Sequence, residues 1–359
     1  GALVTWKLCS VVLLGMGAVV VLTRFSAHRT HSGGAIAVGI LSVWAMELGG
    51  PSALWRHSPI GAGRSSMAAL TSNELVQARH DLEGRLVEEH EGRESSVGFL
   101  WGVAGLALLV NGKSDGSCIG DARTQVGVGL LPAFLHDEPK SAFVIGLGSG
   151  QTAGWLADIE SVERVDVAEI EPSVVRFAKM CEATNRNCVD NPKVNVHLTD
   201  GRESLATLER KYDLIASEPS NPYRAGVASF YTREFYELAR SHLTERGLLA
   251  QWVQAYEVEP TVLQIVLATI RSVFPHVTVW GLERGDLLLV GSNHELNLNL
   301  PAMRERFEED TYRAGLGRIF GVDSAEGVLG LQLANEDFTK TFSEGLSPGL
   351  SLNYDDMPV

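Results

Sequence analysis

The feature that most constrains the fold of this chain is an alternation, from about residue 141 onward, of short apolar runs and stretches with helical periodicity. Short apolar runs bounded by turn residues are typical of buried strands. The strands predicted in this way are Ala142–Ile145, Arg164–Glu169, Val194–Leu198, Tyr212–Ser217, Leu248–Val253, His276–Trp280 and Asp286–Gly291. Strands that alternate with helices predict an α/β fold built on a mostly parallel, doubly wound sheet. The last two strands are separated only by a short turn and are predicted to pair antiparallel.

The first 50 residues differ from the rest in being strongly apolar. Leu8–Thr23 carries no charge and is flanked by Lys7 and Arg24, and Gly33–Met46 is a second apolar stretch. Each is shorter than the roughly 20 residues that span a bilayer, but flanking cations can extend the first. We expect the first to cross a membrane, and the second either to cross or to form a buried or interfacial helix. Because Gly1 is not an initiator Met, we also expect a longer parent protein.

A third apolar run, Val97–Val110, calls for a different interpretation. It is interrupted by glycines and closed by the turn pair Asn111-Gly112, so we predict two short strands rather than a membrane helix. Before it, the Gly-, Ser- and charge-rich residues from 51 to 95 read as a linker followed by a helix over Asn73 to His90.

The composition excludes some classes of function. The formal net charge of -14 argues against a general phosphate-binding surface, so no nucleic-acid partner is expected. Four cysteines are too few for a disulfide scaffold. The spacing of Cys181 and Cys188 fits one helical face better than a metal site, and no metal is expected.

Three loops that follow predicted strands carry the residues of a nucleoside site. The first is Gly146-Leu147-Gly148-Ser149-Gly150, where glycines let the backbone approach a ligand closely. Glu169 ends the next strand, where a carboxylate can accept both ribose hydroxyls; alternatively, the neighbouring Glu171 is only a first-turn helix residue favoured by the helix dipole. Asp200-Gly201 follows the third strand, and Asp200 either accepts from a nucleobase amine or caps the next helix. No Walker-type lysine follows the glycine loop, which disfavours a nucleoside triphosphate.

A fourth loop carries a candidate catalytic carboxylate. Glu218 begins the string Glu-Pro-Ser-Asn-Pro-Tyr, in which two prolines forbid a helix and impose an extended loop. A carboxylate at the end of a core strand can orient or deprotonate a nucleophile. The alternative is a structural carboxylate that binds loop amides.

These strings resemble the spermidine/spermine synthase family, and more closely its bacterial membrane-attached members. The resemblance runs from about Ser96 to Gly291 and returns at Asn353 to Pro358. The matching strings are Val110-Asn111-Gly112-Lys113, Leu131-Pro132, Val144 to Gly150, Ala168 to Pro172, Ser217 to Pro222 and Ser229 to Tyr236.

The resemblance implies a methyltransferase-type Rossmann fold, with the antiparallel strand pair at its end, preceded by a small β-domain. The expected division is residues 1–50 as membrane-associated helices, 51–95 as linker and helix, 96–135 as the β-domain and 136–359 as the catalytic domain. It also implies which residues bind the adenosyl co-substrate, namely Gly146, Gly148, Ser149, Gly150, Glu169, Asp200 and Gly201. In the catalytic loop, Glu218 takes the position of the amine-activating carboxylate and Asn221 that of a second Asp. Gln125 and Tyr223 are expected beside the substrate.

Three departures from the family pattern bear on the substrates. Ser149 stands where the family usually has an Asp that holds the free amine of decarboxylated S-adenosylmethionine, so ordinary S-adenosylmethionine is also a candidate. Asn221 removes one negative charge from the amine pocket. Thr124 replaces a Tyr expected just before Gln125.

The prediction is a membrane-attached transferase of polyamine biosynthesis that moves an aminopropyl group from decarboxylated S-adenosylmethionine to a small-molecule amine. The alternatives are an S-adenosylmethionine-dependent methyltransferase on the same fold, or a non-catalytic ligand-sensing domain. Besides the amine, the expected partners are the membrane, through residues 1–50, and a second copy of the chain in a homodimer. Because the co-substrate is made inside the cell, we expect the catalytic domain on the cytoplasmic side of the inner membrane.

Overall fold

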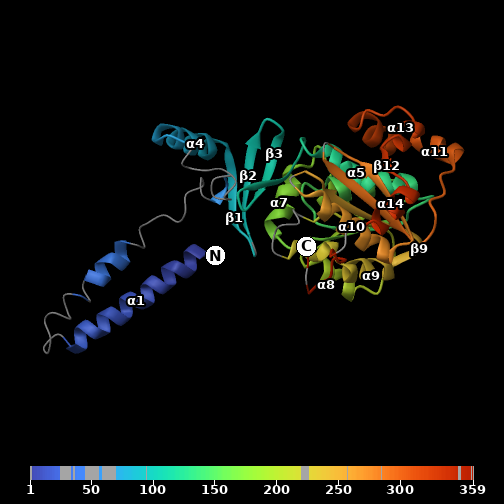
Figure 1. The fold of residues 1–359 in the computed structure, drawn as a ribbon. Helices are drawn as coiled ribbons and strands as arrows, with labels where there is room; N and C mark the ends of the chain where they lie inside the picture. Colours follow the sequence, from blue (N-terminus) through green and yellow to red (C-terminus); the bar gives the residue numbers. More distant parts are fainter. Residues whose placement is uncertain are drawn as a thin grey trace. The chain divides into compact units, whose positions relative to one another are not determined.

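The computed structural model of this chain (Figure 1) describes residues 2–24, 34, 37–44, 56–58, 70–93, 95–219, 226–256, 258–283, 285–346, 349–356 and 358. The chain divides into two compact units. One consists of Gly1–Leu100 with Leu109–Lys113, and the other of Trp101–Leu108 with Ser114–Val359. Each unit is described by itself.

The helices of the first unit are α1 (Ala2–Arg24) and α4 (Ser72–Arg85), and residues 37–44 are also helical. A capping box starts α4: Glu74 N–H donates to the Thr71 side chain, and the Glu74 carboxylate accepts from Thr71 N–H. The helix predicted to reach His90 ends at Arg85, because the next residues form strand β1 (Leu86–Glu91). This strand alternates half-buried and exposed residues, which is the period of a strand and not of a helix.

Among the described residues, no helix combines the length and the apolar character that crossing a membrane requires. A single helix needs about 20 predominantly apolar residues to span the hydrocarbon core. This finding overturns the predicted membrane span at Leu8–Thr23, and with it the predicted location at the inner membrane.

A four-stranded sheet has the order β1-β2-β3-β4, with β2 at Ser96–Gly102, β3 at Gly105–Val110 and β4 at Lys113–Ser117. The apolar run from Val97 to Val110 is therefore two strands, as predicted. Asn111 and Gly112, between β3 and β4, both have positive φ (50° and 78°). That is the backbone of a type I′ hairpin turn, for which Asn-Gly is the preferred pair.

The second unit is built on an eight-stranded sheet with the order β12-β10-β11-β9-β8-β5-β6-β7. The strands are β5 (Ser141–Ile145), β6 (Arg164–Ala168), β7 (Val194–His197), β8 (Tyr212–Ser217), β9 (Leu243–Gln254), β10 (His276–Gly281), β11 (Asp286–Ser292) and β12 (Gln332–Ala334). Strands β5 to β9 run parallel to one another, whereas β11 pairs antiparallel with β9 and, as predicted, with β10. The predicted α/β fold with a Rossmann-type sheet is confirmed.

Helices and turns connect these strands (Figure 1). They are α5 (Ala122–Leu135), α6 (Gln151–Asp158), α7 (Pro172–Met180), η2 (Cys188–Asp190), α8 (Gly201–Thr207), η3 (Val227–Tyr231), α9 (Arg233–Ser241), α10 (Pro260–Val273), α11 (Leu300–Phe307), α12 (Asp310–Tyr312), η4 (Arg313–Ile319), α13 (Ala325–Leu329) and α14 (Glu336–Glu344). Strand β12 and the helices beyond residue 300 were not predicted from the sequence.

The chain visits the strands in an order that creates a reversal at β5. It moves outward from β5 to β6 and β7, and then returns to the other side of β5 with β8 and β9. Ligands of open α/β sheets bind at the carboxyl ends of the strands where this order reverses. The loops after β5, β6, β7 and β8 therefore meet at one edge of the sheet.

The two faces of the sheet bury different sets of side chains. Leu287 and Leu289 of β11 pack into an apolar core with α9 and α10 residues. Side chains alternate along a strand, so Asp286 and Leu288 point to the other face, which α5 covers. Helix α5 also packs closely against α6: a Cβ on Gly129 would lie 2.9 Å from the main-chain oxygen of Thr152 in α6.

Candidate active site

The glycine loop after β5 has a backbone that depends on its glycines. Gly146, Gly148 and Gly150 have φ values of 89°, 51° and 80°, in the left-handed region that side chains disfavour. A Cβ on Gly146 would also come 2.8 Å from the main-chain oxygen of Glu218. The loop is thus pressed against the end of β8, and α6 begins directly after Gly150.

Glu169 follows β6 and lies beside this loop. Its two carboxylate oxygens accept the main-chain N–H groups of Leu147, at 2.9 Å, and of Glu171, at 2.8 Å. The residue is buried, and this burial raises the pKa of its carboxyl above the ordinary value. A carboxylate has about four acceptor positions, so both oxygens can still accept from ribose hydroxyls.

Asp200 follows β7 and is the N-cap of α8. Its Oδ1 accepts the N–H groups of Arg202 and Glu203, each at 2.9 Å. The capping alternative weighed for Asp200 is therefore observed, and neither of these bonds uses Oδ2. Gly201 is buried, and a Cβ there would meet the Ile145 side chain at 2.7 Å.

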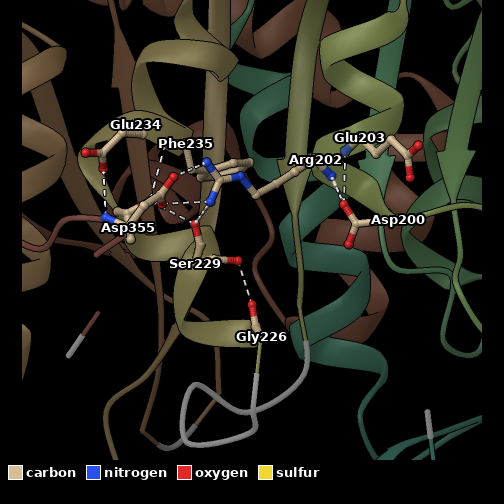
Figure 2. A network of polar contacts seen from close by, with 9 residues as sticks. Asp200, Arg202, Glu203, Gly226, Ser229, Glu234, Phe235 and Asp355 are labelled. Carbon is tan, nitrogen blue, oxygen red and sulfur yellow. Dashed lines mark hydrogen bonds and ion pairs between the residues drawn. The ribbon is translucent and has the colours of Figure 1, made fainter. Parts of the chain in front are cut away.

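The chain's C-terminal segment also contacts the start of α8, through Arg202 (Figure 2). Both terminal nitrogens of Arg202 donate to the Asp355 carboxylate, at 2.8 and 2.7 Å, and Arg202 Nη1 also donates to the Ser229 carbonyl. The Thr232 hydroxyl donates to Asp355 at 2.6 Å, and Asp355 N–H donates to Glu234. A segment far away in the sequence therefore anchors the loop that carries Asp200.

Glu218 stands at the carboxyl end of β8, partly buried, with its N–H donating to the Ile145 carbonyl of β5. The Thr152 hydroxyl of α6 donates to its carboxylate at 2.7 Å. Burial raises the pKa of the Glu218 carboxyl to about 7; the bond from Thr152 opposes the rise, and the charges of Asp286 and Asp121 add to it. A carboxyl group with a pKa near neutral pH can both accept and donate a proton there.

Ser149 and Gln125 are brought together although α5 and the glycine loop are far apart in the sequence. The Ser149 hydroxyl donates to Gln125 Oε1, and Gln151 Nε2 donates to the same oxygen at 3.0 Å. All three side chains are buried. The predicted substrate residue Gln125 therefore contacts the glycine loop directly. Asn221 and Tyr223 lie outside the described residues.

Sequence reasoning missed Asp286, the first residue of β11. The Thr124 hydroxyl of α5 donates to Asp286 Oδ2 at 2.5 Å. Burial raises the pKa of Asp286 above its ordinary value. An acid at the start of the otherwise apolar string Asp286 to Val290 was the available signal.

A disulfide was also missed. Cys118, just after β4, is bonded to Cys181 at the end of α7, with a sequence separation of 63. Cys181 and Cys188 were predicted to share one helical face, but α7 ends at Met180, with Cys181 as its C-cap, and Cys188 lies in the separate short helix η2. On the Cys118 side, the main-chain oxygens of Ser117 and Cys118 accept from Gln151 Nε2, at 3.4 and 3.3 Å.

A cavity of about 400 Å³ lies elsewhere in this unit. Lys140 and Glu163, which line it, precede β5 and β6, so it opens at the amino ends of these strands. It contains none of the candidate residues above.

Comparison with known proteins agrees with this geometry. Residues 125–280 match the model of the Spermine/spermidine synthase domain family. A polyamine aminopropyltransferase of Nitrosomonas europaea is 32% identical over 145 residues, which make up 40% of this chain and 44% of that protein. One of Clostridium perfringens is 30% identical over 152 residues, 42% of this chain and 53% of that protein. The chain thus spans about half the length of these curated relatives.

Solved structures show the same fold. A spermidine synthase from Thermotoga maritima matches with a TM-score of 0.60 and 18% identity, over 72% of this chain and 88% of that one. A spermidine synthase in complex with the transition-state analogue AdoDATO matches with a TM-score of 0.62 and 17% identity, with the same coverage.

Proposed function

We propose that the protein transfers an aminopropyl group from decarboxylated S-adenosylmethionine to an amine, because residues 125–280 match the model of the Spermine/spermidine synthase domain family. The observation that carries the proposal is the Glu218 carboxyl, which has a pKa of about 7 and stands beside the glycine loop. The curated relatives, which are polyamine aminopropyltransferases, support the same reaction.

In the proposed reaction the protein has to position the donor and the amine and to remove a proton from the amine. The donor carries a positively charged sulfur, so the adjacent carbon of its aminopropyl arm is already electrophilic. The amine nitrogen forms a bond to this carbon while the carbon–sulfur bond breaks, and methylthioadenosine leaves with the electron pair. A free alkyl amine has a pKa of about 10.4 and is mostly protonated at neutral pH. Glu218 would take the proton that the amine loses, held in place by the Thr152 hydroxyl.

The adenosyl part would be held by residues at the ends of β5, β6 and β7. Glu169 would accept from the ribose hydroxyls, and Asp200 from the base amine through the oxygen that does not cap α8. The backbone of Gly146 to Gly150 would approach the remainder of the donor. Bringing donor and amine together in one orientation supplies a large part of the rate enhancement.

The test is to incubate the purified protein with decarboxylated S-adenosylmethionine and a panel of amines, and to identify the nucleoside that forms. Methylthioadenosine together with an aminopropylated amine is the expected result, and Glu218→Gln should abolish most of it. Absence of both products with every amine, from protein that still binds the donor, contradicts the proposal.

One observation favours a second candidate, transfer of a methyl group from S-adenosylmethionine. The Ser149 side chain is a neutral hydroxyl that is hydrogen-bonded to Gln125. An acidic side chain at this position would repel the carboxylate of S-adenosylmethionine, whereas a hydroxyl does not. The same assay with S-adenosylmethionine distinguishes the two, because methyl transfer releases S-adenosylhomocysteine instead of methylthioadenosine.

A further inference from the structure

The cavity at the amino ends of β5 and β6 is lined mainly by acidic side chains. Its volume of about 400 Å³ falls in the range of small-molecule sites, roughly 300–1,000 Å³. The carboxylates that line it belong to Asp137, Glu138, Glu160, Glu163 and Glu309. Only two cationic side chains line the same cavity. A concave surface with an excess of negative charge raises the local concentration of cations.

The two cations of the cavity, Lys140 and Arg306, are already held by the protein. Lys140 Nζ donates to the Glu138 carboxylate at 2.6 Å. Arg306 donates to the main-chain oxygen of Asp137 at 2.7 Å, and the Asp137 carboxylate is paired with Arg246 at 2.7 Å. These contacts account for the carboxylates of Glu138 and Asp137 and leave the other three.

Within the described ranges, the carboxylates of Glu160, Glu163 and Glu309 have no ion-pair partner. Glu163 acts on the charge of Lys140, but from beyond the distance of an ion pair. Loss of contact with water raises the pKa of the Glu309 carboxyl; the charge of Arg306 opposes the rise, and that of Glu160 adds to it. Glu160 and Glu309 therefore lie close enough to repel one another, and a cation between them would relieve the repulsion.

The Tyr312 hydroxyl is a second polar group of the cavity that lacks a partner. Tyr312 is only 1% exposed, and its ring packs edge-on against Phe134, with 5.5 Å between the ring centroids. No hydrogen bond joins its hydroxyl to another group in the part of the chain that the structure describes. Burial raises the pKa of this hydroxyl, Arg306 opposes the rise and Glu309 adds to it, so the hydroxyl lies beside two side chains of the cavity wall. A buried hydroxyl normally has a partner, and here a ligand in the cavity can supply it.

The arrangement of the three unpaired carboxylates favours an extended organic cation over a metal ion. Among the described residues, no group of three or more Asp, Glu, His or Cys side chains could hold one metal ion. Glu160 and Glu163 precede β6, whereas Glu309 precedes α12. Carboxylates distributed in this way match a cation whose charges are separated along a chain. An ammonium group also has three N–H donors, so it can reach a carboxylate and the Tyr312 hydroxyl at once.

We propose that this cavity binds a linear polyamine cation at a site separate from the candidate active site. One ammonium group lies between Glu160 and Glu309 and donates to the Tyr312 hydroxyl, and another lies near Glu163. The candidate active site is at the opposite ends of the same strands. Strand β5 has five residues, each about 3.3 Å long, so roughly 16 Å separate the two sites. Binding here does not depend on the proposed aminopropyl transfer.

The first experiment measures binding of spermidine to the full chain by calorimetry at low ionic strength. The double variant Glu160→Gln with Glu309→Gln should bind it at least tenfold more weakly than the wild type at this site. Tyr312→Phe, which keeps the ring, should bind it at least threefold more weakly. Unfolding curves check that the variants fold. Absence of spermidine binding to the wild type, or unchanged affinity in either variant, overturns the proposal.

The matched control is the double variant Glu305→Gln with Glu344→Gln. It also removes two negative charges, but from exposed side chains of α11 and α14 that do not line the cavity. We expect it to change spermidine affinity by less than twofold. If it weakens binding as much as the cavity variant does, the effect comes from net charge and the proposed contacts are wrong.

Two further comparisons identify the ligand class and the location. Butylamine, with one charge, should bind at least tenfold more weakly than spermidine, and Mg²⁺ at equal concentration should not displace spermidine. Equal binding of butylamine, or displacement by Mg²⁺, would mean that the cavity does not recognise a polyamine. Glu218→Gln should leave this binding event intact, because Glu218 lies at the other edge of the sheet. If Glu218→Gln abolishes all spermidine binding, the candidate active site holds the ligand and the cavity proposal fails.

Discussion

The side-chain amide of Asn185 donates a 2.8 Å hydrogen bond to the main-chain oxygen of Ser149, which ties the glycine loop to the segment after α7. The same nitrogen donates to the Ala178 carbonyl at 2.7 Å, and Asn185 Oδ1 accepts the N–H of Cys188. Asn185 is fully buried. Its N–H in turn donates to the carbonyl of Cys181, so the disulfide end of α7 and the glycine loop form one connected structure.

Removing the disulfide should therefore lower stability. Replacing both Cys118 and Cys181 by Ala frees a loop with a sequence separation of 63 in the unfolded chain. We expect the free energy of unfolding to fall by about 2–4 kcal/mol, measured by denaturant titration under non-reducing conditions. Cys9→Ala, at an exposed free cysteine, is the control and should change little. Equal stability of the double variant and the wild type would mean that packing alone holds the two segments.

Glu218→Gln should lower turnover by about 100-fold or more, as is typical for a lost general base. The pKa of about 7 adds a pH signature. In the wild type, kcat/KM should rise with pH through this value, because only the ionised carboxylate can accept the proton. In the variant the rise near pH 7 should disappear while binding of the nucleoside persists. Unchanged turnover would assign Glu218 a structural role.

The same substitution should stabilise the fold at high pH. The carboxyl has a pKa of about 7 in the folded state, against an ordinary value of 4.5. The unfolded chain therefore ionises first, and stability is lost as pH rises from about 4.5 to about 7. The neutral amide of Glu218→Gln does not take part in this loss, so the variant should gain about 1–3 kcal/mol over the wild type at pH 8. Thermal unfolding at pH 4.5 and pH 8 measures the difference, which should be small at the lower pH.

Glu169→Gln should weaken binding of adenosyl ligands at least tenfold in calorimetry. The amide lacks the charge that we propose attracts the ribose hydroxyls, and its NH₂ group would face main-chain N–H donors of Leu147 or Glu171. Glu171→Gln is the control, and it addresses the alternative interpretation of this acidic pair. A larger loss in the control than in Glu169→Gln would transfer the ribose role to Glu171 or remove it from both.

Asp355→Asn tests whether the C-terminal segment positions Asp200. The Arg202 side chain would lose its bidentate charged partner. In the native protein the hydrogen bonds from Arg202 lower the pKa of the Asp355 carboxyl. We expect affinity for adenosine-containing ligands to fall by a factor of about 2–10, without loss of the fold. Asp356→Asn, next in the chain, is the matched control. A fall of the same size in both variants would point to net charge rather than to the contact with Arg202.

The local pattern of the sequence predicted much of the sheet and the positions of the candidate carboxylates at its strand ends. The seven predicted strands all occur, because short apolar runs bounded by turn residues are typical of strands that pack in a sheet. Glu169, Asp200 and Glu218 each follow such a strand. Parallel strands end at a common edge, so identifying the strands was enough to place these carboxylates together.

The sequence by itself thus determined the strands, the glycine turns and the acids at the strand ends, all of which depend on neighbouring residues. Tertiary structure alone decided the contact of Thr124 with Asp286, the disulfide between Cys118 and Cys181, and the bond between Ser149 and Gln125. It also ended the predicted Asn73–His90 helix early, by giving its last residues a strand partner in β2. These contacts join segments far apart in the chain, and they form only because burial of the apolar faces of α5 and the sheet brings the segments into contact. No local periodicity encodes which distant side chains then meet.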